Sequence, residues 1–123
     1  MVTAFDRANI HAAPHARVQA HGGEGLIEFC RLAETGALSG GVNFIDHAVL
    51  APGVSIGRHR HGVDEEELYL VISGVGVMWR DGEEFEVRRG DLVRNRPGGA
   101  HGLRNAGPEA LEIFVIELSV SAR

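Results

Sequence analysis

Short apolar runs separated by glycine limit the folds open to this chain more than any other pattern in it. Glycine fills 17 of the 123 positions, and many of these glycines lie between runs rich in β-branched and aliphatic residues. Glycines spaced in this way between short apolar runs favour an all-β sandwich or barrel over a helical fold. The expected strands cover residues 26–32, 42–50, 54–61, 67–73, 75–80, 84–87, 92–94, 101–105 and 111–118.

The length of the chain fits one domain with one modest core. We expect the barrel to occupy residues 25–123, and residues 1–24 to form either a mobile N-terminal arm or an added edge strand. Asp81-Gly82 is a turn pair that suits a tight hairpin with positive φ. Residues 68–72 are apolar at adjacent positions, so both faces of that strand should be buried. These doubly apolar strands and the N-terminal segment suit an edge strand added across a two-fold axis, so a homodimer is expected.

Charge and composition exclude several classes of function. The net charge is −5 with histidine neutral, and no basic cluster is dense enough to follow phosphates, so no nucleic-acid partner is expected. No apolar run has the length of a membrane span and no signal pattern opens the chain, so the expected location is cytoplasmic. Cys30 is the only cysteine, which excludes an intrachain disulfide and a thiolate metal cage.

Four side chains carry the ligand types of a metal centre. His59 and His61 stand one residue apart, and alternate residues of a strand point to the same face, so both imidazoles should enter one cavity. Glu67 follows, and His101 lies forty residues after His61. Imidazoles combined with a carboxylate suit divalent iron, manganese, nickel, copper or zinc.

The spacing around these residues forms two motifs. In the first, Gly53 precedes His59 by five intervening residues, and Glu67 precedes Gly74 by six. This pattern resembles the first motif of the cupin superfamily, except that five residues separate His61 from Glu67 where the family has three or four.

The second motif has the overall distances of its cupin counterpart. Gly90, His101 and Asn105 hold the expected positions, whereas Pro97 and Gly99 are each displaced by one residue. The chain is thus similar to a small single-domain cupin over roughly residues 42–118. That resemblance implies a double-stranded β-helix (jelly roll) barrel.

The resemblance also implies the metal ligands, which are His59, His61, Glu67 and His101. Glu66 would satisfy the shorter motif spacing and stays an alternative to Glu67 as the carboxylate ligand. Glu67 keeps the distance to the following glycine and is favoured.

Three residues are candidates for catalysis. Glu67 can act as a base in a site of this kind. Tyr69 shares its parity and should face inward, where it either hydrogen-bonds a substrate or fills the barrel. His47, on the preceding strand, is a candidate to orient a metal ligand or contact a substrate, or else a structural histidine. His11, His15 and His21 are interpreted as incidental.

Two functions follow from this site. The first is a metal-dependent enzyme acting on a small oxygenated metabolite, of the oxygenase, isomerase or cyclase type found among small cupins. Its substrate would bind the metal through adjacent oxygen donors, as in a catechol, enediol or diketone. The alternative is a non-catalytic module that binds a metal or a small molecule.

Overall fold

The computed structural model describes residues 5–120 as ten β-strands joined by turns and loops. The strands are β1 (Ala16–Val18), β2 (Ile27–Ala33), β3 (Val42–Leu50), β4 (Ser55–Arg60), β5 (Glu65–Ser73), β6 (Val75–Arg80), β7 (Glu83–Arg88), β8 (Leu92–Asn95), β9 (Ala100–Asn105) and β10 (Leu111–Ser119).

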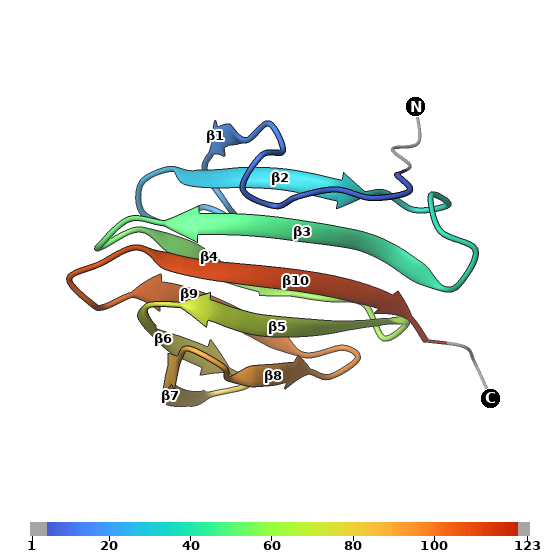
Figure 1. Ribbon diagram of the computed structural model, residues 1–123. Helices are drawn as coiled ribbons and strands as arrows, with labels where there is room; N and C mark the ends of the chain where they lie inside the picture. Colours follow the sequence, from blue (N-terminus) through green and yellow to red (C-terminus); the bar gives the residue numbers. More distant parts are fainter. Residues whose placement is uncertain (1–4, 121–123) are drawn as a thin grey trace.

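The strands form two antiparallel sheets that face each other (Figure 1). The larger sheet has the order β1-β2-β3-β10-β5-β8, and the smaller sheet has the order β4-β9-β6-β7. Most neighbours in the sheets are distant in sequence, as in a jelly roll whose strands alternate between two layers. The prediction of an all-β jelly roll is confirmed.

Strand boundaries follow the sequence pattern closely. β6 and β7 are joined through Asp81 and Gly82, whose φ values of 49° and 84° confirm the predicted tight turn. The main difference is β5, which begins at Glu65 rather than Glu67, because the end of β10 continues to pair with it there. A polar stretch that looks like a loop can join a sheet when a neighbouring strand is long enough to pair with it.

The space between the sheets is filled mainly by aliphatic side chains. Tyr69 and Val71 of β5 face inward and are buried with Ile113 and Val115 of β10. Met78 belongs to the same cluster from the smaller sheet. Burial of each such side chain stabilises the fold by about 2 kcal/mol, so this cluster holds the two sheets together.

The N-terminal segment passes from one side of the larger sheet to the other. In Figure 1 it runs across β2 before it forms β1, which pairs with β2 at the sheet edge. The chain then reaches β4, where the Gly57 amide donates to the Ala20 carbonyl at 2.9 Å and the Ser55 amide to the Glu24 carbonyl at 2.9 Å. Residues before the expected barrel therefore pair with one sheet and hydrogen-bond to the other.

Part of the outer face of β5 and β8 is apolar and open. Leu70 and Leu92 are register partners on this face, with 37% and 65% of their surface exposed. No described residue covers these two side chains, although the adjacent apolar positions predicted burial on both faces. Within residues 5–120 there is no helix long and apolar enough to cross a bilayer.

Candidate metal centre

The structure brings the four predicted metal ligands together inside the barrel. His59 of β4 is the register partner of His101 of β9, and His61 follows β4 directly. Glu67 enters from β5 in the opposite sheet. One ligand atom from each residue lies within 4.8 Å of those of the other three. These four residues are called the ligand cluster below.

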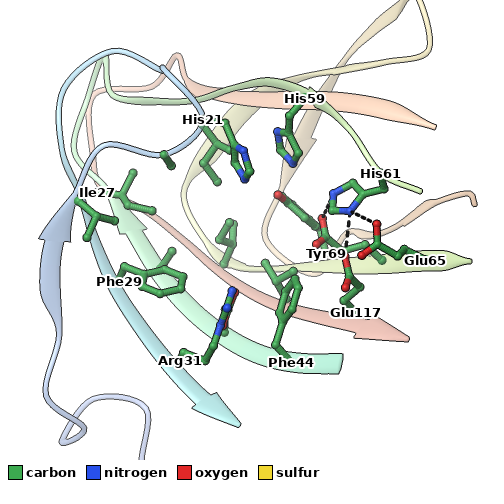
Figure 2. A pocket seen from close by; sticks show the side chains of 18 of the residues that line it. His21, Ile27, Phe29, Arg31, Phe44, His59, His61, Glu65, Tyr69 and Glu117 are labelled. Carbon is green, nitrogen blue, oxygen red and sulfur yellow. Dashed lines mark hydrogen bonds and ion pairs between the residues drawn. The ribbon is translucent and has the colours of Figure 1, made fainter. Parts of the chain in front are cut away.

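One hydrogen bond and one close contact with a carboxylate orient the imidazoles of His59 and His61. Nδ1–H of His59 donates to the Gly57 carbonyl at 2.7 Å, which leaves its Nε2 lone pair free. Nδ1 of His61 lies 2.8 Å from Oε1 of Glu117 (Figure 2), so its Nε2 is likewise directed away from that carboxylate. Contacts of this kind fix the tautomer and ring orientation of metal-binding histidines.

Buried polar atoms without hydrogen-bond partners gather at the ligand cluster. Among the described residues they are His61 Nε2, Glu67 Oε1, both ring nitrogens of His101, and Nδ2 and Oδ1 of Asn95. Nε2 of His101 lies 2.9 Å from Oε1 of Glu67, yet the two groups are not aligned as a hydrogen bond. Each unsatisfied buried group costs about 1–3 kcal/mol. A divalent cation would satisfy His61 Nε2, Glu67 Oε1 and one ring nitrogen of His101, so these residues fit a metal ion.

The protonation states in the ligand cluster also suit a cation. Burial lowers the pKa of His59 to about 4, and the nearby imidazoles of His101, His21 and His61 contribute to that shift. Burial alone would raise the pKa of Glu67, but the imidazoles of His101 and His61 bring it down to about 2. A neutral imidazole and an ionised carboxylate are the forms that bind metal ions.

Three carboxylates surround His61. The nearby carboxylate of Glu67, followed by the charges of Glu117 and Glu65, raises the pKa of His61 despite its burial. Glu117 is itself 3% exposed, and burial raises its pKa. The alternation of β10 places Ile113, Val115 and Glu117 on the inner face, which is the only sequence signal that could have identified Glu117.

Tyr69 faces the ligand cluster, as its parity predicted. Its ring packs edge-on against His101 with 5.3 Å between centroids, and 4% of the residue is exposed. Burial and the negative charges of Glu67 and Asp46 raise the pKa of Tyr69 well above its ordinary value. Its hydroxyl therefore keeps its proton and can donate a hydrogen bond to a neighbouring oxygen.

Glu67, and not Glu66, lies in the ligand cluster. Glu67 is 3% exposed and points into the barrel, whereas Glu66 points outward and pairs with Arg94 on β8. The two residues alternate along β5, so only one can reach the interior.

The ligand cluster lies at one side of a hollow of about 540 Å³ (Figure 2). The opposite wall carries Phe29, Phe44 and Arg31. His21 also lines the hollow, and its ring stacks on His59 with 3.5 Å between centroids. The interpretation of His21 as incidental is therefore wrong. No local pattern could reveal this contact, because it depends on how the N-terminal segment folds back onto β4.

His47 does not belong to the ligand cluster. Phe44, Asp46 and Ala48 of β3 face the hollow, so the intervening His47 points to the outer face of the sheet. There its Nε2 lies 2.6 Å from Oε2 of Glu112, and its Nδ1 lies 2.7 Å from Nε2 of His15. The prediction that His47 takes part in catalysis or supports a metal ligand at this centre is corrected by this placement.

Comparisons with known proteins agree with this architecture. The Cupin domain family matches residues 46–117. An oxalate-binding protein from Thermotoga maritima is 30% identical over 95 residues, which cover 77% of this chain and 78% of that protein. The tetracenomycin polyketide synthase protein TcmJ from Streptomyces glaucescens is 36% identical over 75 residues, 61% of this chain and 48% of TcmJ.

A solved structure shows the same fold. The crystal structure of a predicted oxalate decarboxylase from Thermotoga maritima superposes with a TM-score of 0.88 at 25% identity, covering 93% of this chain and 99% of that one. The family match, the relative and the two-sheet barrel agree with one another. The chain belongs to the cupin family, as a small cupin with a single barrel.

Proposed function

We propose that this protein is a metal-dependent cupin enzyme that acts on a small oxygenated metabolite, in a reaction of the oxygenase, isomerase or cyclase type. The observation that carries this proposal is the group of unpartnered buried atoms on His61, Glu67 and His101, which converge beside an apolar hollow. A buried polar site next to a substrate-sized cavity is the usual arrangement of an active site.

The ligand cluster would hold the metal through three imidazoles and one carboxylate. Divalent iron, manganese, nickel, copper and zinc all accept this ligand set. A bound ion of this group supplies Lewis acidity and, for iron, nickel or copper, one-electron chemistry. The protein's contribution is to keep His59 neutral and Glu67 ionised, and to orient the imidazoles of His59 and His61 through Gly57 and Glu117.

The walls of the hollow indicate the kind of substrate. Adjacent oxygen donors, as in a catechol, enediol or diketone, would face the ligand cluster. Phe29 and Phe44 offer apolar surface to the remainder of the molecule, and Arg31 lies between them with its guanidinium 4.3 Å from the Phe44 ring centroid. A hollow of about 540 Å³ has room for a body larger than the chelating group alone.

Two residues are placed to handle protons. Tyr69 keeps its hydroxyl proton and lies against His101, so it can donate to a substrate oxygen held at the ligand cluster. Glu67 can accept a proton if its carboxylate leaves the metal. This assignment keeps both residues as catalytic candidates.

A second candidate is a non-catalytic binding module. The Thermotoga maritima relative at 30% identity is named an oxalate-binding protein, and Arg31 offers a cation in the hollow to an anionic ligand. Under this proposal a small dicarboxylate would bind at the metal without turnover. A small dicarboxylate would leave the apolar walls formed by Phe29 and Phe44 unused, so we favour the enzyme with a larger substrate over this module.

The two candidates differ in a direct assay. Protein loaded with each of the five metals is incubated with a catechol, a β-diketone or oxalate, while product formation, oxygen uptake and binding are measured. Turnover that is lost in the variant H59A/H101A and kept in R89A, an exposed position that does not line the hollow, supports the enzyme. Oxalate binding without any product supports the module, and oxalate binding that survives metal removal would contradict both uses of the ligand cluster.

A further inference from the structure

A second group of metal-ligating side chains lies outside the barrel, on the outer face of the larger sheet. Nε2 of His11 and Nε2 of His47 both approach the same atom, Oε2 of Glu112, at 2.7 and 2.6 Å. The residues come from the N-terminal segment, β3 and β10. With His15, these residues are called the outer cluster.

Hydrogen bonds fix which nitrogen of His47 is free. Nδ1 of His15 lies 2.7 Å from the Ala13 carbonyl, which can only accept, so this nitrogen carries the proton. Nε2 of a neutral His15 then accepts from Nδ1–H of His47 at 2.7 Å. In a neutral His47 the remaining nitrogen, Nε2, therefore presents a lone pair toward Glu112. Metal-binding histidines are typically held by such a bond from their other nitrogen.

A proton or a cation must lie between Nε2 of His47 and Oε2 of Glu112. A carboxylate oxygen and an imidazole lone pair repel each other at 2.6 Å unless a proton or a cation bridges them. Without a cation, a proton must bridge this contact in a place where only 2% of the His47 side chain is exposed. A bound divalent cation would fill the same position, because it accepts both the imidazole lone pair and the carboxylate oxygen as ligands.

The surroundings of the outer cluster allow an ion to enter. Ligand atoms around tetrahedral zinc lie about 3.3 Å apart, so the present contacts must open by about 0.7 Å. His11 can open its own contact with Glu112, because 68% of its side chain is exposed, and the His47 contact opens by a turn of the partly exposed Glu112 carboxylate. The turn over residues 9–13 that carries His11 is nevertheless held by hydrogen bonds. The Ala13 amide donates to the Asn9 carbonyl at 2.9 Å, and the His11 amide donates to Asn9 Oδ1 at 2.8 Å.

From this geometry we propose that His11, His47 and Glu112 form a second metal site, which takes zinc or a similar divalent cation and fastens the N-terminal segment to the outer face of the sheet. Two imidazoles and one carboxylate are a common zinc ligand set with a fourth position open to water. His15 acts as a positioning residue for His47. The proposal does not depend on the function of the barrel.

Zinc titration of a chain that lacks barrel ligands tests the site. The variant H59A/H101A, without an affinity tag, should still bind one zinc ion per chain by calorimetry and elemental analysis. Adding H11A or E112Q should weaken this binding at least about tenfold. Adding E28Q should leave it unchanged, because Glu28 is an exposed carboxylate that shares the register partner Val49 with Glu112 but lies outside the outer cluster.

Several results would overturn the proposal. They are the absence of zinc binding in H59A/H101A, or equal affinities of the H11A and E28Q derivatives. If H59A/H101A does not fold, the comparison of wild type with H11A must show the loss of one zinc equivalent. Because H11A leaves the barrel ligands in place, its outcome is separate from that of the proposed enzyme.

Proteolysis supplies a second measurement. Arg17 is exposed on β1, and trypsin cleavage there reports how firmly the N-terminal segment is held. Zinc should slow this cleavage in wild type and have no effect in H11A. Equal protection with and without zinc would mean that hydrogen bonds alone hold the segment, and would contradict the metal site.

Discussion

Arg31 and Asp46 form a two-point ion pair between neighbouring strands at the wall of the hollow. They are register partners on β2 and β3, and Nε and Nη2 of Arg31 donate to the two carboxylate oxygens at 2.9 and 3.0 Å. The guanidinium also lies over the Phe44 ring. Arginine is thereby held in one orientation toward the cavity, with donors left over for a ligand.

The first prediction concerns the pH dependence of stability through this pair. Burial raises the pKa of Asp46 above 3.8, and the contacts with Arg31 offset only part of that effect. The folded chain therefore binds more protons than the unfolded chain just above pH 3.8, so this group's contribution to stability falls as pH rises through the folded pKa. The variant Asp46→Asn lacks this dependence, because its side-chain amide does not titrate.

The measurement is denaturant unfolding of wild type and Asp46→Asn between about pH 3.5 and 6, a range that brackets the ordinary pKa of an aspartate. The free energy of unfolding of wild type minus that of the variant should decrease as pH rises across the lower part of this range. A difference that is constant or increases would show that the pKa of Asp46 is not raised.

His61→Ala should remove most of the bound metal. The lost imidazole cannot be replaced by Arg60, which is exposed and donates to the Gly98 carbonyl. Loss of one of four ligands should weaken metal binding at least about tenfold. Elemental analysis of the purified variants checks this, with Arg60→Ala as the control that keeps its metal; equal contents in the two variants would contradict the assignment.

The two adjacent glutamates at the start of β5 give a matched pair. Glu67→Gln replaces a buried carboxylate of the ligand cluster with a neutral amide and should weaken metal binding at least about tenfold. Glu66→Gln disrupts only the partly exposed ion pair with Arg94, so it should change the metal affinity little. Metal titration of both variants is the measurement, and the reverse order of affinities would make Glu66 the ligand.

Gly57 is predicted to be intolerant of a side chain. A Cβ there would lie 2.0 Å from the His21 carbonyl oxygen, whereas a Cβ at Gly40 would meet nothing within 4 Å. Gly57→Ala should therefore lower the free energy of unfolding by about 3 kcal/mol, and Gly40→Ala should change it by less than about 1 kcal/mol. Chemical denaturation of both variants measures these two free energies, and equal values would contradict the clash at Gly57.

We also expect a homodimer, formed through the apolar outer face of β5 and β8. Leu92→Glu places a charge at the most exposed leucine of that face and should yield a 13.2 kDa species in light scattering. Val63→Glu, at an exposed loop position, should leave the dimer intact. A wild-type chain that is already 13.2 kDa in solution would disprove this expectation.

Residues whose placement depends on local alternation can be assigned from the sequence. His59, His61 and Glu67 are of this kind, because period-two patterning along one strand decides which side chains share a face. For His47 the pattern leaves a catalytic and a structural role open, because Asp46 and His47 are both polar and alternation does not show which of them faces inward. His21 cannot be assigned at all, since its contact with His59 joins segments almost forty residues apart.

The path of residues 5–24 around the sheet edge ties the exterior of the protein to its interior. The same short stretch supplies His11 and His15 to the outer cluster, β1 to the sheet, and His21 to the hollow. Removing the residues before about position 25 would therefore delete part of the cavity wall and also expose the buried imidazole of His47. A variant truncated at this point would differ from the full chain both in its cavity and at the outer cluster.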